Sequence, residues 1–133
     1  MLFTVPVGFH VYMGSYKTYA KGVVWVFDKV VTDTHNAYNA ATGKFVVPEK
    51  GLYIFSYGTL SDPGKMSHAG LYVNGIVKSW QACNNGGGRG LWLSISNSVT
   101  LLLQKNDVVY VADHYSTALV RTSYTYLSGA KLN

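Results

Sequence analysis

The sequence predicts an all-β protein, folded as a sandwich or barrel of short strands, and three observations lead to this class. Apolar and polar residues alternate with a period of two in many short segments. Turn residues separate these segments at intervals of about 8–12 residues, which is typical of sandwiches and barrels. No stretch of ten or more residues places its apolar side chains at helical spacing.

The alternation is clearest between residues 51 and 57. A strand here would carry three aromatic side chains on one face and two aliphatic ones on the other: Tyr53, Phe55 and Tyr57 against Leu52 and Ile54. A strand with two apolar faces fits between two layers, or between one layer and a partner subunit.

The next segment predicts a hairpin. Apolar residues alternate from Ala69 to Val73, and a second strand returns from Ile76 to Trp80. Between them stand Asn74 and Gly75, which suit the positive φ angles that both central residues of a type I′ turn require.

Further strands and loops complete the second half of the chain. We expect strands over Leu91 to Ser96, Val99 to Leu103, Val108 to Val111, and Val120 to Leu127, the last broken near Ser128 and Gly129. Residues 105–107 should form a turn, and residues 84–90 and 113–117 should form loops.

Length and composition limit the possible functions. The 133 residues correspond to one domain, residues 1–133. Only 13% of them are charged, so much of the surface should be uncharged or buried against copies of the chain. The net charge is +5, but the basic residues are scattered, so we expect no nucleic-acid partner. The apolar runs are far shorter than about 18 residues, and we expect no membrane insertion.

Residue types and spacings also argue against catalysis. Cys83 is the only cysteine, so we expect neither a disulfide nor a cysteine-rich zinc cluster, and an inert packed thiol. The four histidines, among them His114 beside Asp113, show no metal-binding spacing. There is no Gly-x-Ser-x-Gly motif, and the small number of acidic residues, six, argues against paired catalytic carboxylates. We therefore expect no enzyme activity, no cofactor and no metal site.

One pattern spans the first half of the chain. It consists of Phe, five residues, Asn or Asp, four residues, an aromatic residue or Leu, six residues, Phe, five residues, and Gly-x-Tyr-x-Phe-x-Phe/Tyr. The residues that fill it are Phe27, Asp33, Tyr38, Phe45, Gly51, Tyr53, Phe55 and Tyr57. This arrangement resembles the globular-head domain of complement component 1q. The likeness continues through Asn106 to Val111 and the ending from Tyr124 to Leu132.

The resemblance implies a ten-stranded jelly-roll sandwich of the complement 1q and tumour-necrosis-factor type, assembled as a homotrimer. It implies a secreted recognition protein of the stand-alone invertebrate kind, without a collagen stalk. Such proteins recognise microbial surface sugars and lipopolysaccharide. The pattern residues are a signature of the fold, with Phe27, Phe45 and Phe55 in the core, and they do not mark the ligand site.

Three hypotheses of function remain open. The first is a lectin-like protein that binds microbial polysaccharide or lipopolysaccharide through its loops. The second is a charge-driven binder of anionic polymers, and the third is a trimeric protein-binding or signalling module for a receptor. For the first we expect ligand contacts from the loop residues Arg89, Asp113, His114, Tyr115 and Arg121, with Trp80, Asn84 and Asn85 as further candidates.

Overall fold

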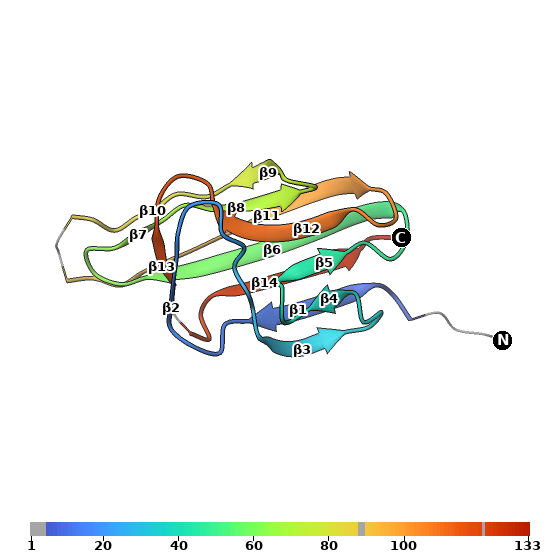
Figure 1. The fold of residues 1–133 in the computed structure, drawn as a ribbon, viewed down its shortest axis with the longest axis horizontal. Helices are drawn as coiled ribbons and strands as arrows, with labels where there is room; N and C mark the ends of the chain where they lie inside the picture. The colour runs from blue at the N-terminus through green and yellow to red at the C-terminus, as the bar shows by residue number, and fades with distance from the viewer. Residues whose placement is uncertain (1–4, 88–89, 121) are drawn as a thin grey trace.

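Two antiparallel sheets of five strands each make up the computed structural model of the chain, which describes residues 5–87, 90–120 and 122–133 (Figure 1). Two short two-stranded ribbons accompany them. In chain order the strands are β1 (Gly8–Tyr12), β2 (Lys17–Tyr19), β3 (Lys29–Asp33), β4 (Tyr38–Asn39), β5 (Lys44–Val46), β6 (Gly51–Ser61), β7 (Met66–Ser67), β8 (Ala69–Val73), β9 (Ile76–Trp80), β10 (Cys83–Asn84), β11 (Leu93–Leu103), β12 (Val108–Asp113), β13 (Ala118–Val120) and β14 (Tyr126–Lys131).

The strand order is that of a jelly roll. The first sheet runs β11-β6-β14-β1-β3 and the second runs β4-β5-β12-β8-β9, while the ribbons pair β10 with β7 and β13 with β2. None of the described residues is helical. The predicted all-β, ten-stranded sandwich is therefore confirmed, with its ten strands in the two sheets.

Strand β6 is central to the first sheet. It pairs along its whole length with β11 on one side, and its residues 53–58 pair with β14 on the other. Its three predicted inward aromatics, Tyr53, Phe55 and Tyr57, are at most 1% exposed. On the opposite face, Leu52 and Ile54 remain 38% and 36% exposed in the single chain, so this face of the sheet is uncovered.

Aromatic rings join the two sheets. Phe9 of the first sheet stacks on Phe45 of the second, with ring centroids 4.3 Å apart. Phe55 approaches both rings edge-on, at 6.3 and 6.1 Å. Phe27, Phe45 and Phe55 are all buried, as predicted. Aromatic pairs of this kind contribute about 0.5–1.5 kcal/mol each beyond the area they bury.

Two polar residues of the sequence pattern have local structural roles. The Asp33 carboxylate accepts hydrogen bonds from the backbone N–H groups of Ala37 and Tyr38, which fixes the β3–β4 turn. The Tyr38 hydroxyl accepts a bond from the Phe27 N–H and donates one to the Phe27 carbonyl. Burial raises the pKa of this phenol above its ordinary value. The hydrogen bonds of the Tyr38 hydroxyl thus hold the backbone at Phe27 in place.

The predicted turns have the expected geometry. Asn74 and Gly75 have φ angles of 51° and 83°, and Val73 pairs with Ile76 across them. Asn106 has a φ of 75° in the turn before β12. Asparagine tolerates this left-handed conformation because its short polar side chain can bond locally.

The prediction of two strands between residues 91 and 103 is wrong, because β11 runs without a break from Leu93 to Leu103. The polar residue Asn97 lies inside this strand, facing Tyr57 of β6. Its amide nitrogen is 3.0 Å from the Tyr57 hydroxyl and 3.1 Å from the Ser79 hydroxyl. These bonds let an inward-facing amide continue the strand.

The prediction of a strand from Val120 to Leu127 is also wrong. The strand β13 ends at Val120, and Ser123 adopts a φ of 66° in the turn that follows. The Ser123 N–H donates to the Met13 carbonyl at 2.8 Å. The chain has therefore left the β2–β13 ladder at this point. The expected break near Gly129 is absent, since Gly129 lies within β14.

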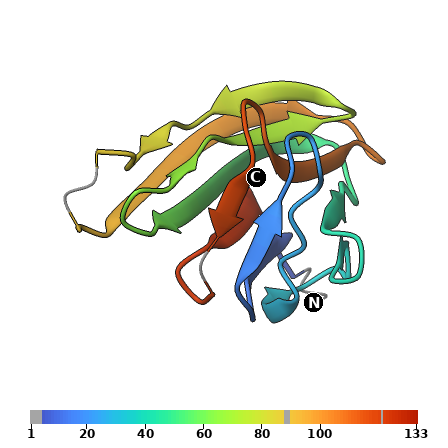
Figure 2. The same ribbon diagram turned by 60° about the vertical axis from the view of Figure 1, so that its left-hand side comes forward.

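The long axis of the sandwich separates two ends. Figure 1 places the C-terminus at the end where β1 begins. Figures 1 and 2 both show the β6–β7 connection extending from the opposite end. Loops at this opposite end are accessible for recognition, while the strands behind them form a rigid support.

Candidate functional site

A buried carboxylate organises the loop after β12. Asp113, predicted to lie in a loop, is instead the last residue of β12, and its side chain is 0% exposed. One carboxylate oxygen accepts the N–H groups of Tyr115 and Ser116 at 2.8 and 2.7 Å, and the other accepts that of His68 at 2.8 Å. Bonds from a charged acceptor are strong, so they fix this loop against the start of β8.

Three aromatic side chains gather over this anchor, and we call them the histidine–tyrosine surface: His68, His114 and Tyr115. The rings of His68 and Tyr115 lie 4.8 Å apart, and those of His68 and His114 lie 5.9 Å apart. Tyr115 is 67% exposed, and both histidines are half-buried. The surface therefore offers an open aromatic ring with two imidazoles beside it.

Hydrogen bonds orient both histidines. Nε2 of His114 lies 3.0 Å from the carbonyl oxygen of Gln81, and Nδ1 of His68 lies 3.4 Å from the Ser116 hydroxyl. Both partners belong to connections that flank the surface. The two rings are thus held by the protein before any ligand arrives.

The pairing of β8 with β12 explains why these residues meet. Ala69 lies opposite Asp113 in an antiparallel register, so His68, just before β8, and His114, just after β12, are neighbours. His68 was not among the residues predicted from the sequence. Knowledge that β8 and β12 are adjacent would have identified it, but nothing in the local sequence shows that adjacency.

Trp80 borders the histidine–tyrosine surface. It lies opposite Gly70 in the β8–β9 ladder and is 60% exposed. A Cβ at Gly70 would lie 3.4 Å from the Cβ of His114. Side chains of Val77 and Tyr72 lie closer still to that position, at 3.1 and 3.3 Å, so Gly70 is packed closely among its neighbours at this point.

The remaining predicted residues have different positions. Asn85 faces the protein, where its amide nitrogen donates to the carbonyls of Ser61, Asp62 and Leu91. Asn84 is exposed in β10. The residues Arg89 and Arg121 lie outside the described part of the chain. Of the five predicted ligand contacts, His114 and Tyr115 share one surface and Asp113 supports it from inside.

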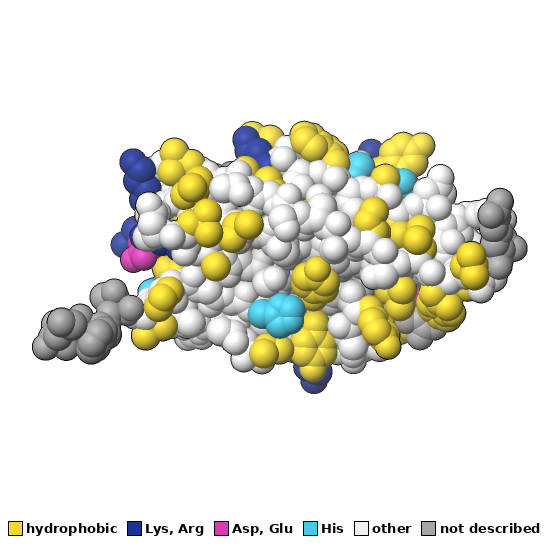
Figure 3. Space-filling view, turned by 180° about the vertical axis from the view of Figure 1, so that it is seen from behind, with side chains coloured by type: hydrophobic (Ala, Val, Ile, Leu, Met, Phe, Trp, Pro, Cys, Tyr) yellow, Lys and Arg dark blue, Asp and Glu magenta, His cyan; other side chains and the backbone are white. Residues whose placement is uncertain are grey.

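The outer face of the first sheet is a second candidate surface. The outward residues of β1, β6, β11 and β14, all of them described, include no acidic residue, lysine or arginine. They are Gly8, His10, Tyr12, Leu52, Ile54, Ser56, Gly58, Leu60, Ser94, Ser96, Ser98, Thr100, Leu102, Tyr126, Ser128 and Ala130. Figure 3 views the molecule from behind and shows charged side chains only towards its margins.

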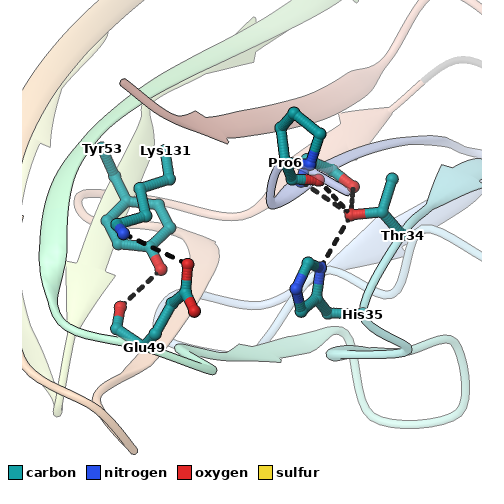
Figure 4. A network of polar contacts seen from close by, with 7 residues as sticks. Pro6, Thr34, His35, Glu49, Tyr53 and Lys131 are labelled. Carbon is teal, nitrogen blue, oxygen red and sulfur yellow. Dashed lines mark hydrogen bonds and ion pairs between the residues drawn. The ribbon is translucent and has the colours of Figure 1, made fainter. Parts of the chain in front are cut away.

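A cleft of about 600 Å³ lies near the ends of the chain. In Figure 4, Glu49 and Lys131 form an ion pair on one side, with Nζ and Oε1 3.1 Å apart. On the other side, the Thr34 hydroxyl donates to the Pro6 carbonyl at 2.7 Å. Lys131 and Glu49 neutralise one another, and the two contacts fasten β14 and the segment before β1 to the rest of the sandwich.

Other features of the described residues bear on function class. The Cys83 side chain is 0% exposed, as expected of a packed thiol. Within residues 5–87, 90–120 and 122–133, no three side chains of His, Cys, Asp or Glu come together as a metal cluster. The same residues contain no helix long and apolar enough to cross a membrane.

Comparison with known proteins gives one family. The family model for the C1q domain matches residues 8–129 of the chain. Two curated proteins match about two thirds of the chain. The heavy metal-binding protein HIP of Mytilus edulis is 35% identical over 89 residues, or 66% of this chain and 40% of that protein. The A-type polypeptide of the complement C1q subcomponent of Mus musculus is 26% identical over 90 residues, or 68% of this chain and 37% of that protein.

Solved structures match the fold more completely. The globular domain of the zebrafish complement 1qA protein aligns with a TM-score of 0.79 at 16% identity, covering 97% of this chain and 98% of that one. The Eiger tumour necrosis factor of S. frugiperda aligns with a TM-score of 0.72 at 13% identity, covering 97% and 94%. The sandwich is therefore shared with both, although few residues are identical.

Proposed function

The chain belongs to the C1q domain family, and we propose that it is a secreted, homotrimeric recognition protein that binds sugars of microbial surfaces, such as lipopolysaccharide or mannan. In this proposal the protein acts by binding and not by catalysis. The histidine–tyrosine surface takes the sugar, and the outer face of the first sheet joins the three protomers.

The composition of the outer face supports the trimer. Stable interfaces are depleted of charged residues at their centre, and this face carries uncharged side chains across four strands. Leu52 and Leu102 lie opposite each other and are 38% and 67% exposed, so a second protomer on this face would remove apolar surface of both from water. The Tyr126 ring covers Gly58 and occupies the space that a Cβ there would need.

The main support for sugar binding is the loop after β12, which the Asp113 carboxylate holds in place. A sugar ring has an apolar face that packs on an aromatic ring and hydroxyl groups that need hydrogen-bond partners. Tyr115 supplies an exposed ring, and imidazole nitrogens can donate or accept hydrogen bonds. Because Asp113 fixes the loop with three backbone bonds, little conformational entropy is lost on binding.

A trimer would strengthen this binding. One loop holds a sugar weakly, but three copies can engage a repetitive polysaccharide together, which raises the overall avidity without new contacts. Recognition of microbial surfaces also requires the protein to be outside the cell, which is why we propose secretion. Arg89 and Arg121 belong to the proposal as further contacts.

A glycan array probed at low and high salt tests this function. We expect binding to microbial polysaccharides that persists at high salt and is inhibited by free monosaccharide. Binding that disappears at high salt would instead identify a charge-driven binder of anionic polymers, since exposed charges are screened by salt. A trimer that binds no glycan would favour the protein-binding or signalling module.

A further inference from the structure

We propose that His68 and His114 together bind a divalent transition-metal ion such as Zn²⁺ or Cu²⁺. The two imidazoles are neighbours on the histidine–tyrosine surface, with ring centroids 5.9 Å apart and planes at 78°. No metal site was predicted from the sequence, because its histidines show no metal-binding spacing. The inference does not rest on sugar binding.

The hydrogen bond of His114 leaves the other ring nitrogen able to bind a metal. A carbonyl oxygen only accepts hydrogen bonds, so Nε2 of His114, 3.0 Å from the Gln81 carbonyl, carries the ring proton. The neutral ring then has its lone pair on Nδ1. Metal-binding histidines almost always donate their second ring N–H to a carbonyl, carboxylate or water in this way.

His68 has the complementary arrangement. Its Nδ1 lies 3.4 Å from the Ser116 hydroxyl, whose oxygen can accept a hydrogen bond from Nδ1–H. In that tautomer the lone pair of His68 is on Nε2. Ser116 is itself fixed by the bond from its N–H to the Asp113 carboxylate at 2.7 Å. Each imidazole therefore has one nitrogen held by the protein and one left for a ligand.

The separation of the rings suits one shared ion. At a metal–nitrogen distance of about 2.1 Å, each ring centroid lies about 3.2 Å from the ion. Two such centroids are about 5.2 Å apart at a tetrahedral angle and about 6.4 Å apart when the ligands are opposite. The observed 5.9 Å lies between these values.

The donor set selects the class of metal. Imidazole nitrogens suit zinc, copper and nickel, whereas calcium and magnesium require oxygen ligands. The Asp113 carboxylate is buried and accepts three backbone hydrogen bonds, so it does not supply those oxygens. Water would complete the coordination on the exposed side.

Calorimetric titration of the untagged protein with Zn²⁺, in the absence of sugar, tests the inference. We expect one ion per chain, and binding weakened about tenfold or more in both His68→Gln and His114→Gln. The Ser116→Ala variant should bind several-fold more weakly, because it loses the orienting partner of His68. His35→Gln, which alters a histidine that contacts Thr34 instead, is the matched control and should bind as the wild type does.

The ¹⁵N signals of the two imidazoles provide a second readout. With Zn²⁺, Nδ1 of His114 and Nε2 of His68 should shift, while their other ring nitrogens keep their hydrogen bonds. Failure of the wild type to bind Zn²⁺ or Cu²⁺ would overturn the inference, and so would binding that both variants retain while their circular dichroism is unchanged. Neither result would bear on sugar binding, which the glycan array measures separately.

Discussion

Gly129 lies directly against the ring of Phe55: a Cβ at position 129 would be 2.7 Å from a carbon of that ring, and equally close to the ring of Phe9. Real Cβ atoms essentially never come so close to a neighbour. The aromatic core between the two sheets therefore occupies the space where β14 would otherwise carry a side chain.

Gly129→Ala should destabilise the fold for this reason. Overpacking of a dense core costs about 1–3 kcal/mol, and we expect a loss of this size in the free energy of unfolding. Urea unfolding at fixed protein concentration measures it. Gly87→Ala is the matched control and should change stability by less than about 0.5 kcal/mol, because Gly87 is exposed and a Cβ there would meet nothing within 4 Å. An unchanged midpoint for Gly129→Ala would show that Phe9 and Phe55 do not fill that space.

The proposed trimer predicts different effects for two exposed isoleucines. Ile54 lies on the outer face of the first sheet and is 36% exposed, whereas Ile76 lies in the second sheet and is 59% exposed. Ile54→Arg should place an unpaired charge in the interface and reduce the sedimentation mass from three chains to one. Ile76→Arg should leave the trimer intact. A wild-type monomer at micromolar concentration would refute the trimer.

The hydrogen bonds of Asp107 predict that the free energy of unfolding falls in acid. Its carboxylate accepts the Gln104 N–H and the Asn74 amide, and these bonds lower the pKa of Asp107 below its ordinary value. In the folded protein it therefore stays charged to lower pH than in the unfolded chain. Its contribution to stability is complete above the ordinary pKa and is lost as the pH falls through the lowered one.

Asp107→Asn should remove this contribution. The variant should be less stable than the wild type at pH 6, and the gap between their urea midpoints should narrow as the pH falls below about 4. A gap that stays constant down to pH 2 would contradict the role of these hydrogen bonds.

Asp113→Asn should loosen the recognition loop. An amide keeps only one acceptor oxygen, so the N–H groups of His68, Tyr115 and Ser116 lose part of their bonding. Hydrogen exchange should become faster at these three amides. Asp28→Asn, which alters a carboxylate bonded to the Gly14 N–H, should leave their exchange rates unchanged. Equal rates in both variants would show that Asp113 does not hold the loop.

Local patterns predicted the elements of the fold that depend on local physics. Asn74 and Gly75 give the hairpin because few residues adopt two positive φ angles in succession. The period of two correctly placed Tyr53, Phe55 and Tyr57 in the core. The arrangement of the strands in two sheets was predicted from the resemblance to a family, because periodicity alone does not determine which strands pair.

Long-range contacts explain what local patterns missed. Asn97 looked like the end of a strand, but it bonds Tyr57 and Ser79, distant residues that keep it inside β11. Gly129 looked like a break, but the rings of Phe9 and Phe55 require it. For the site, His114 and Tyr115 were selected from the sequence, and His68 was missed because only the β8–β12 pairing brings it there.

Sugar recognition by the histidine–tyrosine surface can be tested by comparing Tyr115→Ala with Tyr124→Ala. The measurement is binding of the trimer to immobilised lipopolysaccharide and mannan. Both tyrosines are well exposed, at 67% and 63%, but only Tyr115 belongs to the histidine–tyrosine surface. We expect Tyr115→Ala to lose binding of both ligands while its sedimentation mass and melting temperature are unchanged, and Tyr124→Ala to bind as the wild type does. Unchanged binding by Tyr115→Ala would contradict the assignment of sugar recognition to this surface.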